Sequence, residues 1–187
     1  VSQNWAQKGN SVNDAVLMDQ LGHSVSLSSD GSRFVVGAPN HDNTGTDSGV
    51  QYNSGIAKVY EFNSSLNDWQ QYGNSVLGLV QNDNKGLSVS ISSDGTRFAV
   101  GASGTNNGDV KVFEFDDTWK QVGTSIIGEA NGDEFGNSVS LSGDGNYVAG
   151  GAIKNDATGS SEGHARVFKI CVSPSESPTL SPTLAPT

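Results

Sequence analysis

Three loops carry the residues that could bind a cation or a polar ligand. They span residues 39–55, 103–109 and 153–163 and are rich in Asp, Asn and Gly. Calcium prefers carboxylate and amide oxygens, and the acidic candidates are Asp42, Asp47, Asp109, Asp156 and Glu162. Binding residues concentrate in loops on rigid scaffolds, so the ligand-contact candidates are His41, Asp42, Asn43, Asp47, Tyr52, Asn106, Asn107, Asn155 and Asp156. Ordinary solvated loops have the same composition, and that interpretation stays open.

No catalytic motif accompanies these loops in the sequence. None of the three histidines, His23, His41 and His164, neighbours a plausible nucleophile, and the G-x-S-x-G and H-E-x-x-H patterns do not occur. The Ser-x-Asp-Gly turns are similar to the Asp-box of sialidase propellers, but here Asp and Gly are adjacent. We therefore expect a non-enzymatic protein. Because Asp and Glu are plentiful, an acidic pair for glycoside hydrolysis remains the enzymatic alternative.

A motif of eight residues occurs three times and indicates how the loops are positioned. It reads SVSLSSDG at 24–31, SVSISSDG at 88–95 and SVSLSGDG at 138–145. Each copy precedes an apolar run such as RFVVGA, one of the three loops, and an alternating run such as AKVYEF. Since fixed-period self-similarity marks repeat architectures, the chain consists of repeated units.

The runs within each unit have the pattern of short strands. Alternation of serine with an apolar residue predicts a strand with one buried face, whose buried residues would be Val25, Leu27, Val89, Ile91, Val139 and Leu141. Asp-Gly between two such runs predicts a hairpin, and a run beginning with Trp supplies a fourth strand at 69–73 and 119–123. Four short antiparallel strands per repeat are typical of a β-propeller blade. We therefore predict an all-β chain.

The third unit resembles a known repeat. Its sequence DEFGNSVSLSGDGNYVAGGA, at 133–152, is similar to the FG-GAP repeat, which builds the propeller of integrin α-subunit heads and of many secreted proteins. The resemblance extends over about residues 1–171, although only this copy has the Phe-Gly pair, and the others read Leu21-Gly22 and Lys85-Gly86. Integrin-type repeats often carry a calcium loop with several Asp. The turns of this chain have one carboxylate each, so we do not expect calcium there in the family's manner: Asp30, Asp94 and Asp144.

The repeats divide the chain into five parts. These are an outer Trp strand and linker (1–18), three blades (19–76, 77–126 and 127–171, the last without its fourth strand) and a disordered Pro/Ser/Thr stalk (172–187). Three blades are fewer than the roughly four to eight of most propellers. The ring could be completed by blades upstream in a longer chain, by a second copy, or by the Trp5 strand closing on its own chain. We favour the first of these.

Composition limits the setting and the partners. The formal net charge of −10 disfavours nucleic acid and anionic membranes, and no apolar run is long enough to span a bilayer. Asn63 begins an N-glycosylation sequon, and four of the five Pro lie in the stalk. We expect an extracellular or cell-surface binding or adhesion module that recognises a protein or a glycan, with calcium as the one candidate cofactor. A purely structural spacer is the other alternative.

Overall fold

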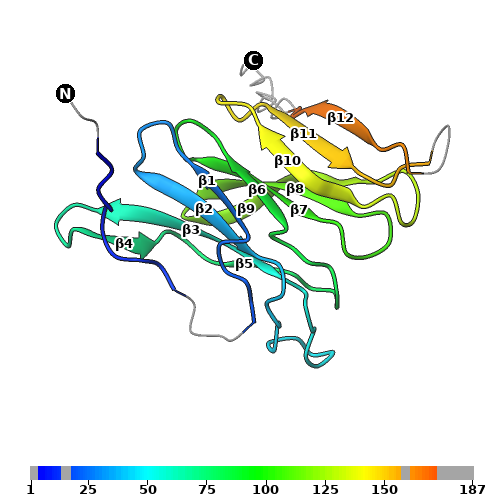
Figure 1. Cartoon of the computed structure of the whole chain (residues 1–187), viewed down its shortest axis with the longest axis horizontal. Coiled ribbons are helices and arrows are strands. Elements are labelled where there is room, and N and C mark those ends of the chain that lie inside the picture. The colour runs from blue at the N-terminus through cyan, green and yellow to red at the C-terminus, as the bar shows by residue number, and fades with distance from the viewer. Residues whose placement is uncertain (1–3, 14–17, 157–160, 172–187) are drawn as a thin grey trace, which may run out of the picture.

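Twelve β-strands and no helix form the described part of the chain, which comprises residues 4–13, 18–156 and 161–171 of a computed structural model (Figure 1). All strand pairs within the sheets are antiparallel, and the all-β prediction is confirmed. No helix in this part is long and apolar enough to cross a membrane. The stalk predicted for 172–187 lies outside the described residues.

The strands form three sheets, which we call the first, second and third blade. The first contains β1 (Ser24–Leu27), β2 (Arg33–Ala38), β3 (Ile56–Asn63) and β4 (Asp68–Gln71) in this order, and β5 (Val76–Leu77) pairs with the start of β3. The second contains β6 (Ser88–Ile91), β7 (Arg97–Ala102), β8 (Asp109–Asp116) and β9 (Thr118–Ile127). The third contains β10 (Phe135–Leu141), β11 (Tyr147–Ala152) and β12 (His164–Lys169). This up-and-down strand order is that of propeller blades.

A single carboxylate holds each Asp-Gly turn. Asp30 Oδ1 accepts hydrogen bonds from Ser28 Oγ at 2.7 Å and from the Ser32 amide at 2.9 Å. Hydrogen bonds to the ionised form lower a carboxyl pKa, and here, with the Ser32 amide contributing most, they lower the pKa of Asp30 to about 2. The pKa values of Asp94 and Asp144 are lowered in the same way, by a serine hydroxyl first and a backbone amide second. These three residues act as turn formers.

The serines and glycines of the motif join one blade to the next. Ser24 Oγ donates to Gly86 O at 2.8 Å, and Ser88 Oγ donates to Gly136 O at 2.7 Å. A Cβ atom on Gly37 would lie 2.0 Å from Gly86 O, so the backbones of two blades approach closely only because this residue is glycine. The motif recurs because both junctions are built from the same contacts.

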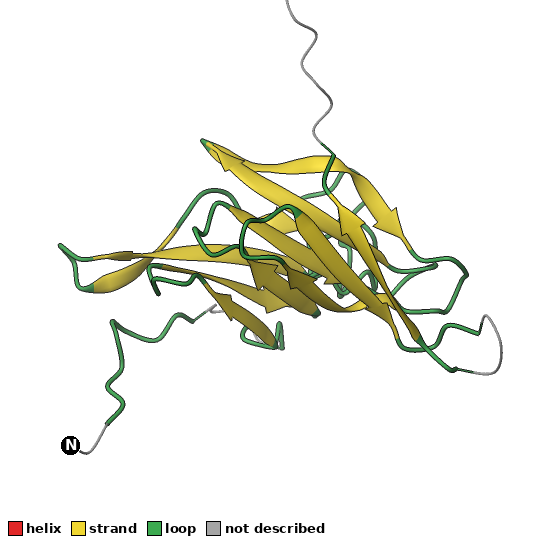
Figure 2. Cartoon of the chain, turned by 90° about the horizontal axis from the view of Figure 1, so that it is seen from above, coloured by secondary structure: helices red, strands yellow, loops and turns green. Residues whose placement is uncertain are grey.

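The hydrophobic core lies in these junctions, and strands of neighbouring blades overlap in layers (Figure 2). Val89, Ile91 and Leu141 are buried against the preceding blade, as predicted. The prediction that Val25 and Leu27 are buried is wrong, since they are 64% and 60% exposed. Among the described residues, no blade packs on their side of the first blade.

Tryptophan anchors the outer strand of the first two blades. Trp119 is buried, its ring lies edge-on to Phe98 at 4.8 Å, and its Nε1 donates to Tyr72 O at 2.7 Å. Trp69 Nε1 donates in the same manner to Lys8 O at 2.8 Å. Trp5 is fully exposed, and residues 4–13 contain no strand, so the outer strand expected around Trp5 has no pairing partner here.

Candidate functional site

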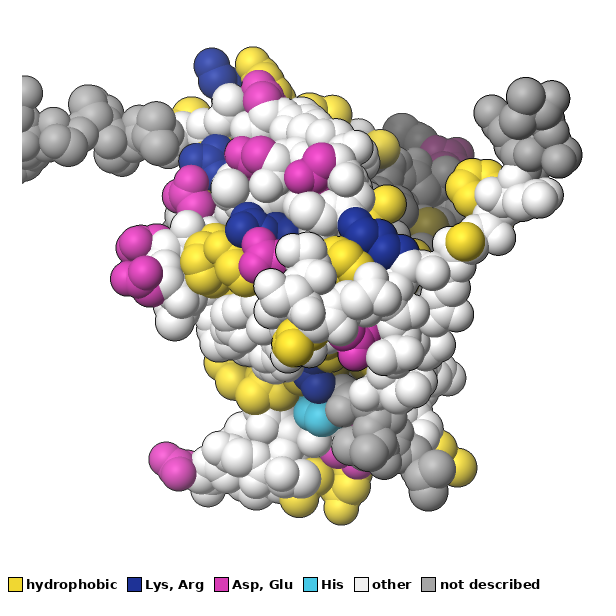
Figure 3. Space-filling view, turned by 90° about the vertical axis from the view of Figure 1, so that its left-hand side faces the viewer, with side chains coloured by type: hydrophobic (Ala, Val, Ile, Leu, Met, Phe, Trp, Pro, Cys, Tyr) yellow, Lys and Arg dark blue, Asp and Glu magenta, His cyan; other side chains and the backbone are white. Residues whose placement is uncertain are grey.

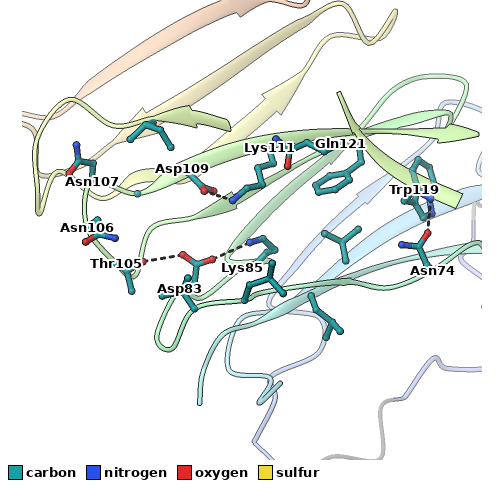
Figure 4. A pocket seen from close by; sticks show the side chains of 17 residues that line it. Asn74, Asp83, Lys85, Thr105, Asn106, Asn107, Asp109, Lys111, Trp119 and Gln121 are labelled. Atoms are coloured by element: carbon teal, nitrogen blue, oxygen red, sulfur yellow. Dashed lines mark hydrogen bonds and ion pairs between the residues drawn. The ribbon is translucent and has the colours of Figure 1, made fainter. Parts of the chain in front are cut away.

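A pocket of about 480 Å³ opens between the first and second blades (Figure 4). One wall is the connection around β5, from Asn74 to Lys85, and the other is the face of β8 and β9. Its volume lies within the range of about 300–1,000 Å³ that small-molecule sites occupy. The pocket is therefore large enough for a ligand of a few functional groups or a single sugar ring.

The pocket exists where Lys85 stands in place of the motif's phenylalanine. In the third blade that phenylalanine is Phe135, which is fully buried and occupies the space over Gly150, where a Cβ would lie 2.5 Å from its ring. In the second blade, Val100 occupies the position of Gly150. At Lys85 the junction therefore has no ring equivalent to that of Phe135.

Two ion pairs line one end of the pocket, one buried and one half-buried. Lys85 Nζ lies 3.1 Å from Asp83 Oδ2, and Lys111 Nζ pairs with Asp109 Oδ2. Figure 4 shows the two pairs on opposite walls with both ammonium groups turned toward the space between them. Burying charges is costly unless they are paired, and each lysine here has a carboxylate two residues away in sequence.

One carboxylate oxygen of this cluster is unsatisfied. Asp109 Oδ1 is buried and has no hydrogen-bond partner among the described residues. A buried acceptor without a donor costs about 1–3 kcal/mol. A ligand hydroxyl or amide N–H placed in the pocket would supply this donor.

The other end of the pocket is apolar. Val76 and Leu77 face it from the first blade, and Phe113 and Trp119 face it from the second. Asn74 Oδ1 accepts a hydrogen bond from the Trp119 amide at 2.6 Å, which holds the connection against β9 (Figure 4). An apolar surface next to convergent polar groups is the usual lining of a ligand site.

The structure brings three of the predicted candidates into this pocket: Asn106, Asn107 and Asp109. Asn107 has a structural role as well, because its Nδ2 donates to Gly128 O at 2.9 Å. Asn106 has a left-handed backbone with φ of 51°. Lys85 and Lys111 were not among the sequence candidates. The signal that could have identified Lys85 is a lysine at the position of the motif's phenylalanine.

The candidates of the first long loop mainly hold that loop together. His41 Nδ1 lies 2.5 Å from Asp19 Oδ2, and Asp42 Oδ1 accepts from the Asn53 amide at 2.8 Å. Asn43 is buried and donates to Gly78 O at 2.9 Å. The two remaining candidates of this loop are exposed: Asp47 and Tyr52.

The candidates of the third loop lie away from the pocket. Asn155 is buried and donates to Asp133 Oδ2 at 2.8 Å, while Asp156 Oδ1 accepts from the Ser161 amide. Glu162 is exposed. No three His, Cys, Asp or Glu side chains group together within the described residues, so the five acidic candidates for calcium do not form one cluster there. Asn63 lies at the exposed end of β3, where Oδ1 accepts from the Ser65 amide.

An aspartate that recurs in every unit fixes the loop after the second strand. Asp19 contacts His41, Asp83 accepts from Thr105 Oγ1 at 3.1 Å, and Asp133 accepts from Asn155. The separation is 22 residues in each case. The regular recurrence of the aspartate is visible in the sequence. Its contact could not be predicted, because the partner residue is His in the first unit, Thr in the second and Asn in the third.

A comparison with family models agrees with the repeat structure. The FG-GAP repeat family matches residues 11–52 and 128–168. No curated protein sequence matches the chain. A solved structure, the periplasmic gluconolactonase PpgL of Pseudomonas aeruginosa, is similar with 20% identity and a TM-score of 0.49. That match covers 71% of this chain and 37% of the gluconolactonase. Two segments of the chain therefore match the FG-GAP repeat, the repeat that its sequence resembles.

Proposed function

We propose that the chain is a non-catalytic binding module that recognises a glycan in the pocket between its first and second blades. The observation that carries the proposal is the buried, unpartnered Asp109 Oδ1 beside two ammonium groups. A sugar hydroxyl donates and accepts at the same oxygen. It can therefore donate to Asp109 Oδ1 and accept from Lys85 or Lys111, while the apolar face of the sugar ring packs on the wall around Phe113.

An extracellular or cell-surface setting fits this role. FG-GAP repeats are typical of extracellular proteins, and the chain contains two matches to this family. The Asn63 sequon lies in an exposed turn that an oligosaccharide can reach. In such a setting the module would act in adhesion. A protein ligand that presents a hydroxyl or amide group would bind the same groups of the pocket, Asp109 Oδ1 and the ammonium groups of Lys85 and Lys111.

Asp83 and Asp109 support a second candidate, a glycoside hydrolase. Both carboxylates line the same pocket, and most glycoside hydrolases use a pair of acidic residues on either side of the scissile bond. The two candidates differ in one observable: a hydrolase converts the ligand, whereas a binding module returns it unchanged.

A double substitution tests the proposal. Asp109→Asn with Lys111→Met removes one ion pair without leaving a charge unpaired, because both partners are neutralised together. A glycan panel first identifies the glycans that the wild-type chain binds. For these glycans we expect the double variant to lose at least tenfold in affinity, measured by calorimetry. The matched control is Asp116→Asn with Lys120→Met, which removes an exposed pair at the far end of the same strands and should leave affinity unchanged.

Three outcomes contradict the binding proposal. If no glycan binds, the spacer interpretation is preferred. If the pocket variant retains full affinity, the ligand binds elsewhere. If the bound glycan is cleaved and Asp109→Asn abolishes cleavage, the chain is a hydrolase.

A further inference from the structure

The first and third blades each have an open face that matches an internal junction. Val167 of β12 is 70% exposed, whereas its equivalents in the other blades, Val59 and Val112, are 1% and 4% exposed because the next blade covers them. On the first blade, Val25 and Leu27 are exposed on the face that a preceding blade covers elsewhere. In Figure 3, which views the molecule from the left-hand side of Figure 1, hydrophobic side chains are exposed next to Lys and Arg. A third blade packed on a first blade would bury both sets.

The third blade also retains the glycine that a close neighbour requires. A Cβ on Gly37 or Gly101 would lie 2.0 Å from a carbonyl oxygen of the next blade. Gly151 occupies the equivalent position, where the nearest atom to such a Cβ is Ser138 Oγ at 2.5 Å in its own blade. Ser138 itself is exposed, whereas its equivalent Ser88 donates to the next blade.

β12 lacks the partner strand that its equivalents have. In the first blade Phe62 pairs with Trp69, and in the second Phe115 pairs with Trp119. The third blade has three strands among the described residues, and β12 presents an open edge. By repeat equivalence, Ile170 should pair with a tryptophan.

The N-terminal segment, residues 4–10, already makes contacts with the first blade that a fourth strand makes with the neighbouring blade. A Cβ on Gly9 would lie 3.0 Å from Trp69 Cδ1, and the Trp69 indole donates to Lys8 O. Gly73 and Tyr72, which follow β4, make the same two contacts with Trp119. The segment therefore contacts the first blade as the residues after β4 contact the second, although no residue of the segment is paired in a strand.

A pair of side chains identifies which blade this strand belongs to. In the first blade, the Arg33 guanidinium lies 4.0 Å from the Tyr72 ring, a cation–π contact between β2 and the residue that follows β4. Tyr147 stands at the position of Arg33 in the third blade, and Lys8 stands at the position of Tyr72 in the N-terminal segment. The cation and the aromatic ring have exchanged places, so Tyr147 and Lys8 would restore the same contact.

We propose that residues 4–10 of a second copy of this chain supply the fourth strand of the third blade. Within one chain the segment lies beside β3 and β4, on the opposite side from β12, so its own third blade is out of reach (Figure 1). Two copies joined reciprocally close a ring of six blades, within the roughly four to eight that propellers contain. Head-to-tail contacts that close in this way give a finite assembly.

A disulfide trap tests the register directly. The pairing of Trp5 with Ile170 places Asn4 opposite Cys171, as Asp68 lies opposite Asn63 and Thr118 opposite Asp116. Under mild oxidation the Asn4→Cys variant of the chain 1–187 should run at twice the chain mass without reductant. Ala6→Cys, two residues along the same strand face, should remain uncrosslinked, and so should Asn4→Cys with Cys171→Ser.

Three results would overturn the proposal. One is a monomeric mass in light scattering with no crosslink. Another is a crosslink within a single chain, which would show self-closure. Equal crosslinking of Asn4→Cys and Ala6→Cys would also contradict it, since it indicates contact without register.

A side-chain exchange gives a second, independent measurement. Tyr147→Arg would face Lys8 with a like charge, and we expect the dissociation constant of the dimer to rise at least tenfold in sedimentation. Adding Lys8→Tyr recreates the arrangement of Arg33 and Tyr72 and should recover most of that loss. Failure of the second substitution to rescue association contradicts the proposed pairing.

Discussion

At the scale of single residues, the three turn aspartates make the fold sensitive to acid. Asp30 has a pKa lowered from 3.8 to about 2 by hydrogen bonds from the Ser32 amide and from the hydroxyls of Ser28 and Ser32. A depressed carboxyl pKa contributes stability above the unfolded value, and this contribution disappears as the pH falls from 3.8 through about 2. Asp94 and Asp144 act in the same direction. We expect the urea midpoint of the chain to fall over this interval.

The control for this pH dependence is the triple variant Asp30→Asn, Asp94→Asn, Asp144→Asn. It should be less stable than the wild-type chain at neutral pH, and its urea midpoint should change less between pH 4 and pH 2. Parallel pH profiles for the two proteins would show that other carboxylates cause the acid sensitivity.

The residues of the pocket show where sequence reasoning reached its limit. Asn106, Asn107 and Asp109 were predicted as candidates because loops on a β-scaffold carry binding residues. Lys85 was visible as a departure from the Phe-Gly pair, but a departure alone does not indicate a cavity. Whether space remains depends on what packs across the junction, here Val100 where the third blade has Gly150.

At the scale of elements, serine hydroxyls tie neighbouring blades together in both internal junctions. Ser88 Oγ donates to Gly136 O at 2.7 Å within a buried interface. Ser88→Ala leaves that carbonyl without this donor, and we expect a loss of about 1 kcal/mol in unfolding free energy, measured by urea denaturation. Ser138→Ala is the matched control, because the same hydroxyl in the third blade is exposed. Equal effects of the two substitutions would contradict this assignment.

The strands themselves follow from the period-two pattern, and their order follows from the repeat. β1, β6 and β10 begin at or before the serine motif, and each is joined to the next strand by its Asp-Gly turn. β5 was not predicted, since two residues give no period and its pairing depends on β3. The strand expected around Trp5 is unpaired for a related reason: a strand is defined by its partner, and sequence pattern does not provide one.

At the scale of the whole molecule, the three blades form a segment with unlike ends. The first blade exposes valine and leucine, and the third exposes Val167, Ser138 and the edge of β12. Because the two ends are complementary in this way, the proposed association of two copies would add stability that depends on protein concentration. An exposed strand edge is otherwise a site of uncontrolled pairing, so closure of the ring would also protect the chain from aggregation.

Substitution of two equivalent glycines distinguishes the stability of a single chain from the stability of the dimer. Gly101→Ala places a Cβ 2.0 Å from Gly136 O of the next blade in the same chain. We expect this substitution to lower the unfolding free energy by about 1–3 kcal/mol. Gly151→Ala places the same methyl group on the open face of the third blade, where the Ser138 hydroxyl can rotate away. The dilute chain should therefore unfold at the wild-type urea concentration, while the dimer dissociation constant measured by sedimentation rises at least tenfold. A Gly151→Ala chain that associates as the wild type does would mean that no backbone approaches this glycine, and that the third blade is not packed on a first blade.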